Sequence, residues 1–291
     1  MPTDPPPLDL LIVGGLTIDR FADGTSAAGG TVMHATRNAS AAGIRVGVMT
    51  VSGTEPEASA AIDELRRTTA WLSCAPASRT TTFRHREVGG RRRLSLDSLG
   101  GSVEAPPDPR EFPRPAAVLV APIAGEVPDQ MARMWSWPVR RGAILQGWLR
   151  TLALGQVKAL PLAAIALETR HILGAFDVLI ASRPDLSAEK GAPHTLIERL
   201  RKTFGPQPML VVTDGEHGAW LGRGAAAGRK DAAPIHFPAP YVVSGKPTIG
   251  AGDLFAARLL ADPDWTLDTF PAAMERAMLR VAEELERRPA I

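Results

Sequence analysis

The sequence predicts an α/β protein of three layers, in which helices cover both faces of a mostly parallel central sheet. Short apolar runs alternate with helix-compatible segments along the 291 residues. Apolar strands separated by helices are typical of parallel sheets that are buried on both faces. A content of 45% hydrophobic and 22% charged residues is enough to build such a core. We therefore expect a single domain over residues 1–291.

The strands are expected where the short apolar runs lie. These runs span residues 10–14, 45–51, 117–122, 143–146, 178–181 and 209–213. A helix is expected over residues 57–69, where apolar residues recur at helical spacing, and a pair of helices over residues 267–286. Ligands of such sheets bind beyond the carboxyl ends of the strands.

One segment departs from this alternation. Residues 80–97 place β-branched residues before Gly89-Gly90 and alternating leucines after it, which predicts a β-hairpin. The hairpin is rich in arginine, and this leaves a solvated sheet edge and a phosphate or nucleic-acid contact open as interpretations.

The composition argues against several classes of protein. A formal net charge of +2 is small for a general nucleic-acid binder. Cys74 is the only cysteine, so neither an intrachain disulfide nor a thiolate zinc cluster can form. The first residues lack a basic region, and the apolar run after them is too short to span a bilayer. We expect a cytoplasmic protein with no membrane and no nucleic-acid partner.

The turn Gly250-Ala251-Gly252-Asp253 precedes an apolar, alanine-rich helix start. Its glycines allow the backbone to approach a ligand closely, and the helix start offers unpaired N–H groups to an anion. The aspartate can accept the proton of an attacking hydroxyl, so this segment fits phosphoryl transfer. A simpler interpretation is a well-capped helix start, because Asp and Gly are common there. The sequence has no Walker A loop, no nucleophile elbow and no His-Glu-x-x-His motif.

Four segments follow one another along the chain: the first strand followed by Asp19, the segment that begins Gly29-Gly30, the strand and turn 210–218, and the turn 250–253. In this order they resemble landmarks of the ribokinase or PfkB carbohydrate kinase family. The resemblance implies a ribokinase-like fold in which a small β-hairpin lid, with segments near 19–30 and 80–100, covers the acceptor. Pieces at 29–33, 146–150 and 182–185 look like the branch that includes myo-inositol kinases.

The resemblance also implies roles for individual residues in an ATP-dependent kinase that phosphorylates a hydroxyl of a sugar, cyclitol or related small polyol. Asp253 would be the catalytic base, and the backbone of Gly250, Ala251, Gly252 and Asp253 the anion hole. The acceptor would contact Asp19, Gly29, Gly30, His34, Gln146 and Arg150. ATP would lie near Thr213, Gly215 and Gly218, with Mg²⁺ as the second cofactor and Asp185 as its candidate ligand.

The sequence departs from the family pattern at several positions. Pro247 stands where many relatives have a polar residue, His34 where many have Asn, and Ser182-Arg183-Pro184-Asp185 keeps only the acidic end of the Asn-x-x-Glu element. Two other functions therefore stay open: a non-catalytic protein of this fold that binds a nucleotide or sugar, and a nucleic-acid-associated protein that uses the arginine-rich hairpin. A homodimer is a further open expectation, because hairpin lids in this family sometimes pair between subunits.

Overall fold

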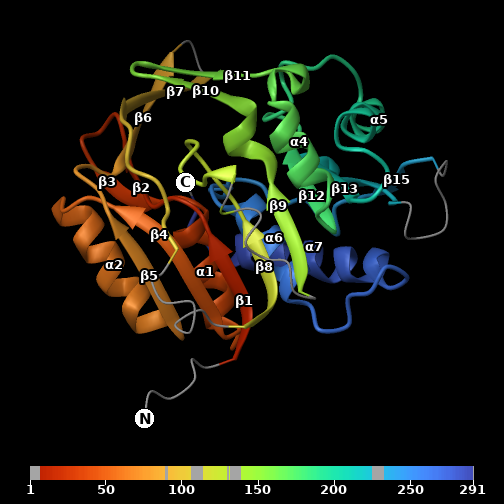
Figure 1. Cartoon of the computed structure of the whole chain (residues 1–291), viewed down its shortest axis with the longest axis horizontal. Coiled ribbons are helices and arrows are strands. Elements are labelled where there is room, and N and C mark those ends of the chain that lie inside the picture. Colours follow the sequence, from red (N-terminus) through yellow and green to blue (C-terminus); the bar gives the residue numbers. More distant parts are fainter. Residues whose placement is uncertain are drawn as a thin grey trace.

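The computed structural model describes residues 7–88, 91–105, 114–129, 131, 139–224 and 233–290. The turn Gly89-Gly90 of the expected hairpin lies outside these residues. The chain forms three layers, with a large sheet between two groups of helices (Figure 1). The predicted α/β class with a mostly parallel sheet is confirmed.

Within the described residues the central sheet has nine strands, in the order β15-β14-β13-β12-β9-β8-β1-β4-β5. Neighbouring strands run parallel, except that β14 is antiparallel to both β13 and β15. All six strands expected from apolar runs are present. The nine strands are β1 Leu8–Val13, β4 Val46–Ser52, β5 Trp71–Pro76, β8 Pro115–Val120, β9 Arg140–Ile144, β12 Val178–Ser182, β13 Met209–Thr213, β14 Ala219–Gly222 and β15 Ile235–Phe237.

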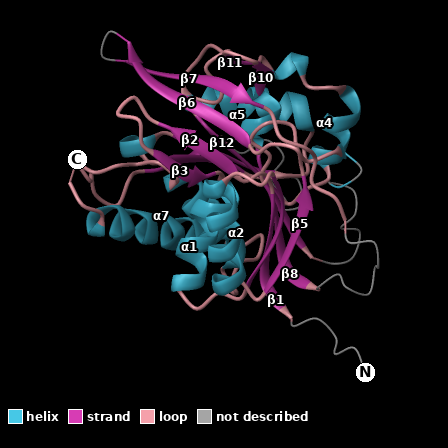
Figure 2. Cartoon of the chain, turned by 90° about the vertical axis from the view of Figure 1, so that its left-hand side faces the viewer, coloured by secondary structure: helices cyan, strands magenta, loops and turns pink. Residues whose placement is uncertain are grey.

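The two faces of the sheet carry separate hydrophobic cores. In β1, Leu10 and Ile12 belong to one core, whereas Leu11 and Val13 belong to the other, as strand alternation requires. The first core is covered by α1 Thr31–Ala41, α2 Pro56–Thr68, α6 Ala251–Ala261 and α7 Phe270–Arg287, and the second by α4 Leu167–Gly174 and α5 Pro193–Phe204. Figure 2 shows α1, α2 and α7 together on one side of the sheet. None of the helices in the described part of the chain is long and apolar enough to cross a membrane.

A second, smaller sheet contains the predicted hairpin. Its order is β3-β2-β6-β7, with β2 Thr17–Arg20, β3 Ser26–Gly29, β6 Thr81–Val88 and β7 Arg91–Ser98. A two-stranded ribbon, β10 Arg150–Ala153 and β11 Gln156–Ala159, contacts β7 through a hydrogen bond of 2.8 Å from Gly155 N to Leu96 O. The strands β6, β7, β10 and β11 lie together at the top of both views (Figures 1 and 2).

Two predicted elements were wrong in detail. The strand expected over 143–146 is β9, which begins at Arg140 and ends its pairing with β12 at Ile144, because the chain then turns through the 3₁₀ helix η2 Leu145–Leu149. The described residues also form the 3₁₀ helices η3 Leu162–Ala164 and η4 Gly215–His217. The pair of helices expected over 267–286 is the single helix α7, whose proline lies in the first turn, where it does not interrupt helical hydrogen bonding.

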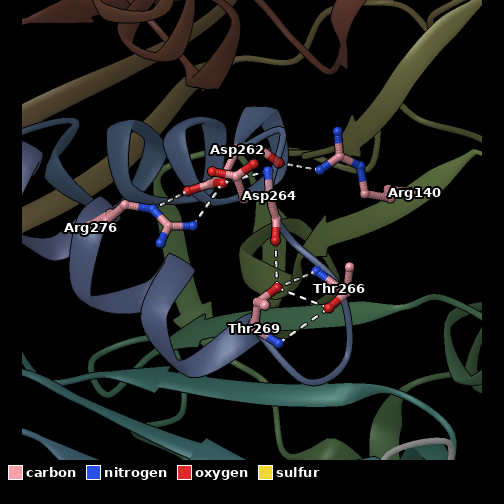
Figure 3. Close-up of polar contacts among 6 residues, drawn as sticks. All are labelled: Arg140, Asp262, Asp264, Thr266, Thr269 and Arg276. Atoms are coloured by element: carbon pink, nitrogen blue, oxygen red, sulfur yellow. Dashed lines mark hydrogen bonds and ion pairs between the residues drawn. The ribbon is translucent and has the colours of Figure 1, made fainter.

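The connection between α6 and α7 is held by polar contacts (Figure 3). Asp262, which follows α6, accepts hydrogen bonds of 2.8 and 2.9 Å from the guanidinium of Arg276 on α7. Arg140 at the start of β9 donates to the main-chain carbonyl oxygen of Asp262. The hydroxyl of Thr269 accepts a 2.8 Å hydrogen bond from Thr266 N. These contacts hold α7 against α6, and both helices line the candidate site.

Candidate active site

Asp253 lies in the first turn of α6, beside the start of α1. The hydroxyl of Thr31, the first residue of α1, donates a 2.6 Å hydrogen bond to Asp253 Oδ1. The Leu254 amide donates to the carbonyl oxygen of Gly250, which caps α6, and the Ala251 amide donates to Thr248 O. The amides of Gly250, Gly252 and Asp253 precede the repeating helical bonds and belong to the end of the helix that attracts anions.

Gly250 is required both by its backbone conformation and by close packing. It has φ of 77° in the left-handed region, where a side chain is strained. A Cβ atom at this position would also lie 2.6 Å from His34 Cγ. The glycine turn therefore packs directly against the imidazole of His34, which the sequence predicts to bind the phosphate acceptor.

The pKa of Asp253 is raised above the usual value of an aspartate. Burial is the main cause, and the negative charge of Asp185 adds to it. The charge of His34, the hydrogen bond from Thr31 and the charge of Arg150 act in the opposite direction. Three of these residues were predicted as site residues, and the structure places all of them within electrostatic reach of Asp253.

Asp185 is the centre of a buried polar cluster. Asp185 is 6% exposed, and its carboxylate accepts hydrogen bonds from Arg150 Nη2 at 3.1 Å and Gln146 Nε2 at 3.3 Å. Ser182 supplies its main-chain N–H at 3.3 Å and its hydroxyl at 2.5 Å. The sequence predicts that Gln146 and Arg150 bind the phosphate acceptor and that Asp185 is a metal ligand, without connecting the three. The structure brings the three together, with Gln146 in η2 and Arg150 at the start of β10.

Asp19 lies in the second sheet against the diglycine segment. A Cβ atom on Gly29 would lie 2.3 Å from Asp19 Oδ2, so the two residues are in direct contact. His85 on β6 places Nε2 at 3.1 Å from Asp19 Oδ1 and stacks on Phe21 at 5.1 Å between ring centroids. Sequence reasoning gave His85 no role. The signal for it was strand alternation, which puts His85 on the same face of β6 as the buried Phe83.

A short segment of backbone links the predicted acceptor-binding residue Asp19 to the predicted base Asp253. Gly29 contacts Asp19, Gly30 caps α1, and Thr31 binds Asp253. The second sheet and the start of α6 therefore meet at three consecutive residues. This juxtaposition could not be read from the sequence, because Asp19 and Asp253 lie at opposite ends of the chain.

Glu126 holds the backbone that packs against the diglycine segment. Nothing in the sequence analysis singled it out. Its side chain is buried, and its carboxylate accepts hydrogen bonds from the main-chain N–H groups of Gly15 at 2.6 Å, Ile123 at 2.8 Å and Ala124 at 2.7 Å. Burial raises the pKa of Glu126, while these hydrogen bonds oppose the rise. The carbonyl oxygen of Gly15 lies 2.3 Å from the position of a Cβ on Gly30. Glu126, which binds Gly15 N–H, therefore holds the backbone against which the diglycine segment packs.

A cavity of about 330 Å³ adjoins the first turn of α6 on its other side. Its lining includes Thr213, Gly215 and Gly218, which the sequence predicts on the nucleotide side, together with Ala251 and Gly252. The apolar part of its wall comes from α6 and α7 and consists of Phe255, Met278, Val281, Ala282 and Leu285. The volume and the mixed lining are those of a small-molecule pocket.

No protein-family model matches the chain, and no curated protein is significantly similar to it in sequence. Solved structures are similar to it in fold. A pyrophosphate-dependent kinase in the ribokinase family, complexed with a pyrophosphate analog and myo-inositol, has a TM-score of 0.72 at 15% identity, over 97% of this chain and 96% of that chain. Arabidopsis thaliana ribokinase, complexed with ribose and ATP, has a TM-score of 0.70 at 16% identity, over 97% and 94%.

Ribokinase from Thermotoga maritima is similar over 97% of this chain and 96% of its own, with a TM-score of 0.67 at 14% identity. At such identities the similarity shows the fold, and it extends over nearly the whole chain. The predicted likeness in fold is confirmed: this chain has the fold of the ribokinase-family kinases.

Proposed function

We propose that the protein is an ATP-dependent kinase that phosphorylates a hydroxyl of a sugar, cyclitol or related small polyol. The observation that carries this proposal is the position of Asp253. It lies between a pocket lined by Ala251 and Gly252 on one side and the cluster of Thr31 and His34 on the other. A base between a donor pocket and a polar acceptor region is what transfer to a hydroxyl requires.

In the proposed reaction Asp253 accepts the proton of the acceptor hydroxyl as its oxygen attacks the γ-phosphorus of ATP. The bond from the acceptor oxygen to phosphorus forms, the bond from phosphorus to the β,γ-bridging oxygen breaks, and ADP leaves. The amides of Gly250, Gly252 and Asp253 would stabilise the charge on the phosphoryl oxygens. A raised pKa suits Asp253 to this role, because a base is most effective when its pKa approaches the working pH.

The donor pocket favours a nucleotide over inorganic pyrophosphate. Its wall of Phe255, Met278, Val281 and Leu285 offers apolar contact that a purine base would use and pyrophosphate would not. The similarity to a pyrophosphate-dependent kinase makes the comparison of both donors necessary. We expect ATP to support turnover and pyrophosphate to support little or none.

Among the described residues, those around Asp253 do not form a chelating site for Mg²⁺. Asp185 accepts hydrogen bonds from Arg150, Gln146 and Ser182, which leaves its carboxylate engaged on both oxygens. Within the described residues no group of three His, Cys, Asp or Glu side chains could hold a metal ion. Asp185 as a magnesium ligand stays a prediction, and no step proposed here depends on it.

The acceptor is proposed to bind between the second sheet and α1. Asp19, held by His85, can accept hydrogen bonds from hydroxyl groups, and the imidazole of His34 can donate or accept one. The second sheet would then act as the lid that excludes water from the transferred phosphoryl group. These contacts are typical of polyol recognition and leave the individual acceptor open.

The test is ADP release from Mg-ATP across a panel of cyclitols, hexoses, pentoses and nucleosides, with Asp253→Asn beside the wild type. We expect at least one polyol to stimulate ADP release and to appear as a phosphate ester by ³¹P NMR, with both signals lost in the variant. ATP binding without product for any acceptor would favour the non-catalytic alternative. Strongly salt-dependent binding to DNA or RNA, again without product, would favour the nucleic-acid alternative.

A further inference from the structure

The glycine turn that precedes Asp253 is tied to the end of the last helix by Arg288. Arg288 follows α7, and its Nη1 donates hydrogen bonds of 2.8 Å both to Pro247 O and to Ile249 O. In the reverse direction, Lys246 Nζ donates a 2.6 Å hydrogen bond to Arg288 O. Two carbonyl oxygens of one turn thus converge on a single cationic group from a segment about forty residues away.

Residues of the turn line two different cavities. Thr248, Ala251 and Gly252 line the donor pocket, whereas Ile249 and Arg288 line a second cavity. The carbonyls of Pro247 and Ile249 point to the Arg288 side, since they accept its hydrogen bonds. The peptide unit is planar and trans, so each following N–H points the other way. Arg288 therefore fixes the direction of the Thr248 and Gly250 amides.

The charge of Arg288 adds to this effect of its hydrogen bonds on the orientation of the peptide units. A guanidinium stays protonated at any working pH, and hydrogen bonds from a charged donor are stronger than neutral ones. A positive charge at the carbonyl ends of these peptide units favours the orientation in which their N–H ends face an anion in the donor pocket. It also offsets the negative partial charge of the two carbonyl oxygens, which would otherwise oppose a polyphosphate.

We propose that Arg288 is a positioning residue for the anion hole: a tethered cation that holds the Pro247 and Ile249 carbonyls and thereby aims the Gly250 amide at the transferred phosphoryl group. The expected effect of Arg288 on turnover rests on the proposed function. The expected effect on polyphosphate binding does not, because it requires only that the turn binds an anion.

Kinetics provide the first test, with Arg288→Ala, Arg288→Gln and Arg288→Lys as variants. The matched control is Arg287→Ala, because Arg287 is 72% exposed and pairs only loosely, at 3.7 Å, with Glu284. We expect Arg288→Ala to lower kcat by about 10- to 100-fold, the range for lost hydrogen bonds to charged groups, with little change in the KM of the acceptor. Arg288→Lys should retain more activity than Arg288→Gln, because lysine keeps the charge.

Chemical rescue separates this role from a structural one. Guanidinium ion at millimolar concentration should restore part of the kcat of Arg288→Ala, and should leave the wild type and Arg287→Ala unchanged. A kcat for Arg288→Ala within twofold of Arg287→Ala would overturn the proposal. So would a loss of activity that guanidinium does not restore and that follows a loss of thermal stability. If Arg288→Ala does not fold, a folded Arg288→Gln with wild-type kcat would overturn it.

Binding of inorganic tripolyphosphate, measured by calorimetry, makes the two proposals separable. We expect Arg288→Ala to weaken this binding at least about tenfold, and Arg287→Ala to leave it unchanged. If the wild type binds tripolyphosphate but phosphorylates no acceptor, the proposed function fails while the role of Arg288 is still decided. If the wild type does not bind tripolyphosphate, or if Arg288→Ala binds it as well as the wild type does, the inference about Arg288 is wrong.

Discussion

The hydroxyl of Thr31 donates a 2.6 Å hydrogen bond to Asp253, across a separation of 222 residues in sequence. This contact joins the start of α1, next to the proposed acceptor-binding residues, to the start of α6, next to the proposed donor pocket. It orients the carboxylate that we propose as the base and stabilises its ionised form.

Asp253→Asn should abolish most phosphoryl transfer. Loss of a general base typically lowers turnover about 10²- to 10⁴-fold. Because the raised pKa means that the folded protein holds this proton more tightly than the unfolded chain does, ionised Asp253 lowers stability above its unfolded pKa. Asparagine carries no such charge, so the variant should be at least as stable as the wild type at pH 7. A kcat close to that of the wild type would remove Asp253 from the mechanism.

Thr31→Val tests the contact between α1 and α6. Removing a hydrogen bond to a charged group should lower kcat by about 10- to 100-fold and raise the pKa of Asp253 further. Thr36→Val is a matched control on the same helix, because Thr36 is fully buried and its hydroxyl has no hydrogen-bond partner among the described residues. Equal kinetics for the two variants would show that the Thr31 hydroxyl is not part of the catalytic arrangement.

The pH dependence of kcat should show the influence of Asp185. A base acts in its deprotonated form, so the rate falls as pH falls through the pKa of Asp253, and this limb should lie above the ordinary aspartate value of about 3.9. Asp185→Asn removes the like charge that raises this pKa, so the acidic limb should move to lower pH. A limb that stays in place, measured over the range in which both proteins are folded, would contradict the coupling.

Gly250→Ala should disrupt the site more than it disrupts the fold. The new Cβ would lie 2.6 Å from His34 Cγ, and displacement of catalytic groups by about 1 Å can cost 10²-fold in rate. Gly245→Ala is the control, because Gly245 also has a left-handed φ, of 67°, but no atom within 4 Å of the added Cβ. It should lose stability by about 1–2 kcal/mol and keep its kcat. Steady-state kinetics of both variants measure the loss of kcat, and thermal melts measure the loss of stability.

Glu126→Gln should weaken the support beneath the diglycine segment. An amide in place of the carboxylate would turn one NH₂ group toward main-chain donors, and an unsatisfied buried group costs about 1–3 kcal/mol. The free energy of unfolding from denaturant titration should fall by that amount, and the KM of the acceptor should rise. Glu104→Gln, at an exposed glutamate, is the control. If Glu126→Gln were as stable as this control, Glu126 would not be needed to hold the backbone next to the diglycine segment.

The features that sequence reasoning predicted well are local. Buried strands such as β1 and β13 appear as continuous apolar runs, and the turn before Asp253 combines residues that are adjacent in the chain. Thr213, Gly215 and Gly218, predicted on the nucleotide side, directly follow a strand, and the structure places them together along one cavity. The single helix α7 was predicted as a pair, since periodicity reports a helical face better than it reports helix ends.

By itself, then, the sequence determined the α/β class, the order of the strands along the chain and the position of the candidate base. Only the tertiary structure decided which distant residues meet: Thr31 with Asp253, His85 with Asp19, Arg150 with Asp185 and Arg288 with the glycine turn. The physical reason is that local periodicity and turn chemistry depend on neighbouring residues. Each of these contacts instead depends on how the whole chain packs around two cores, and no short segment encodes that packing.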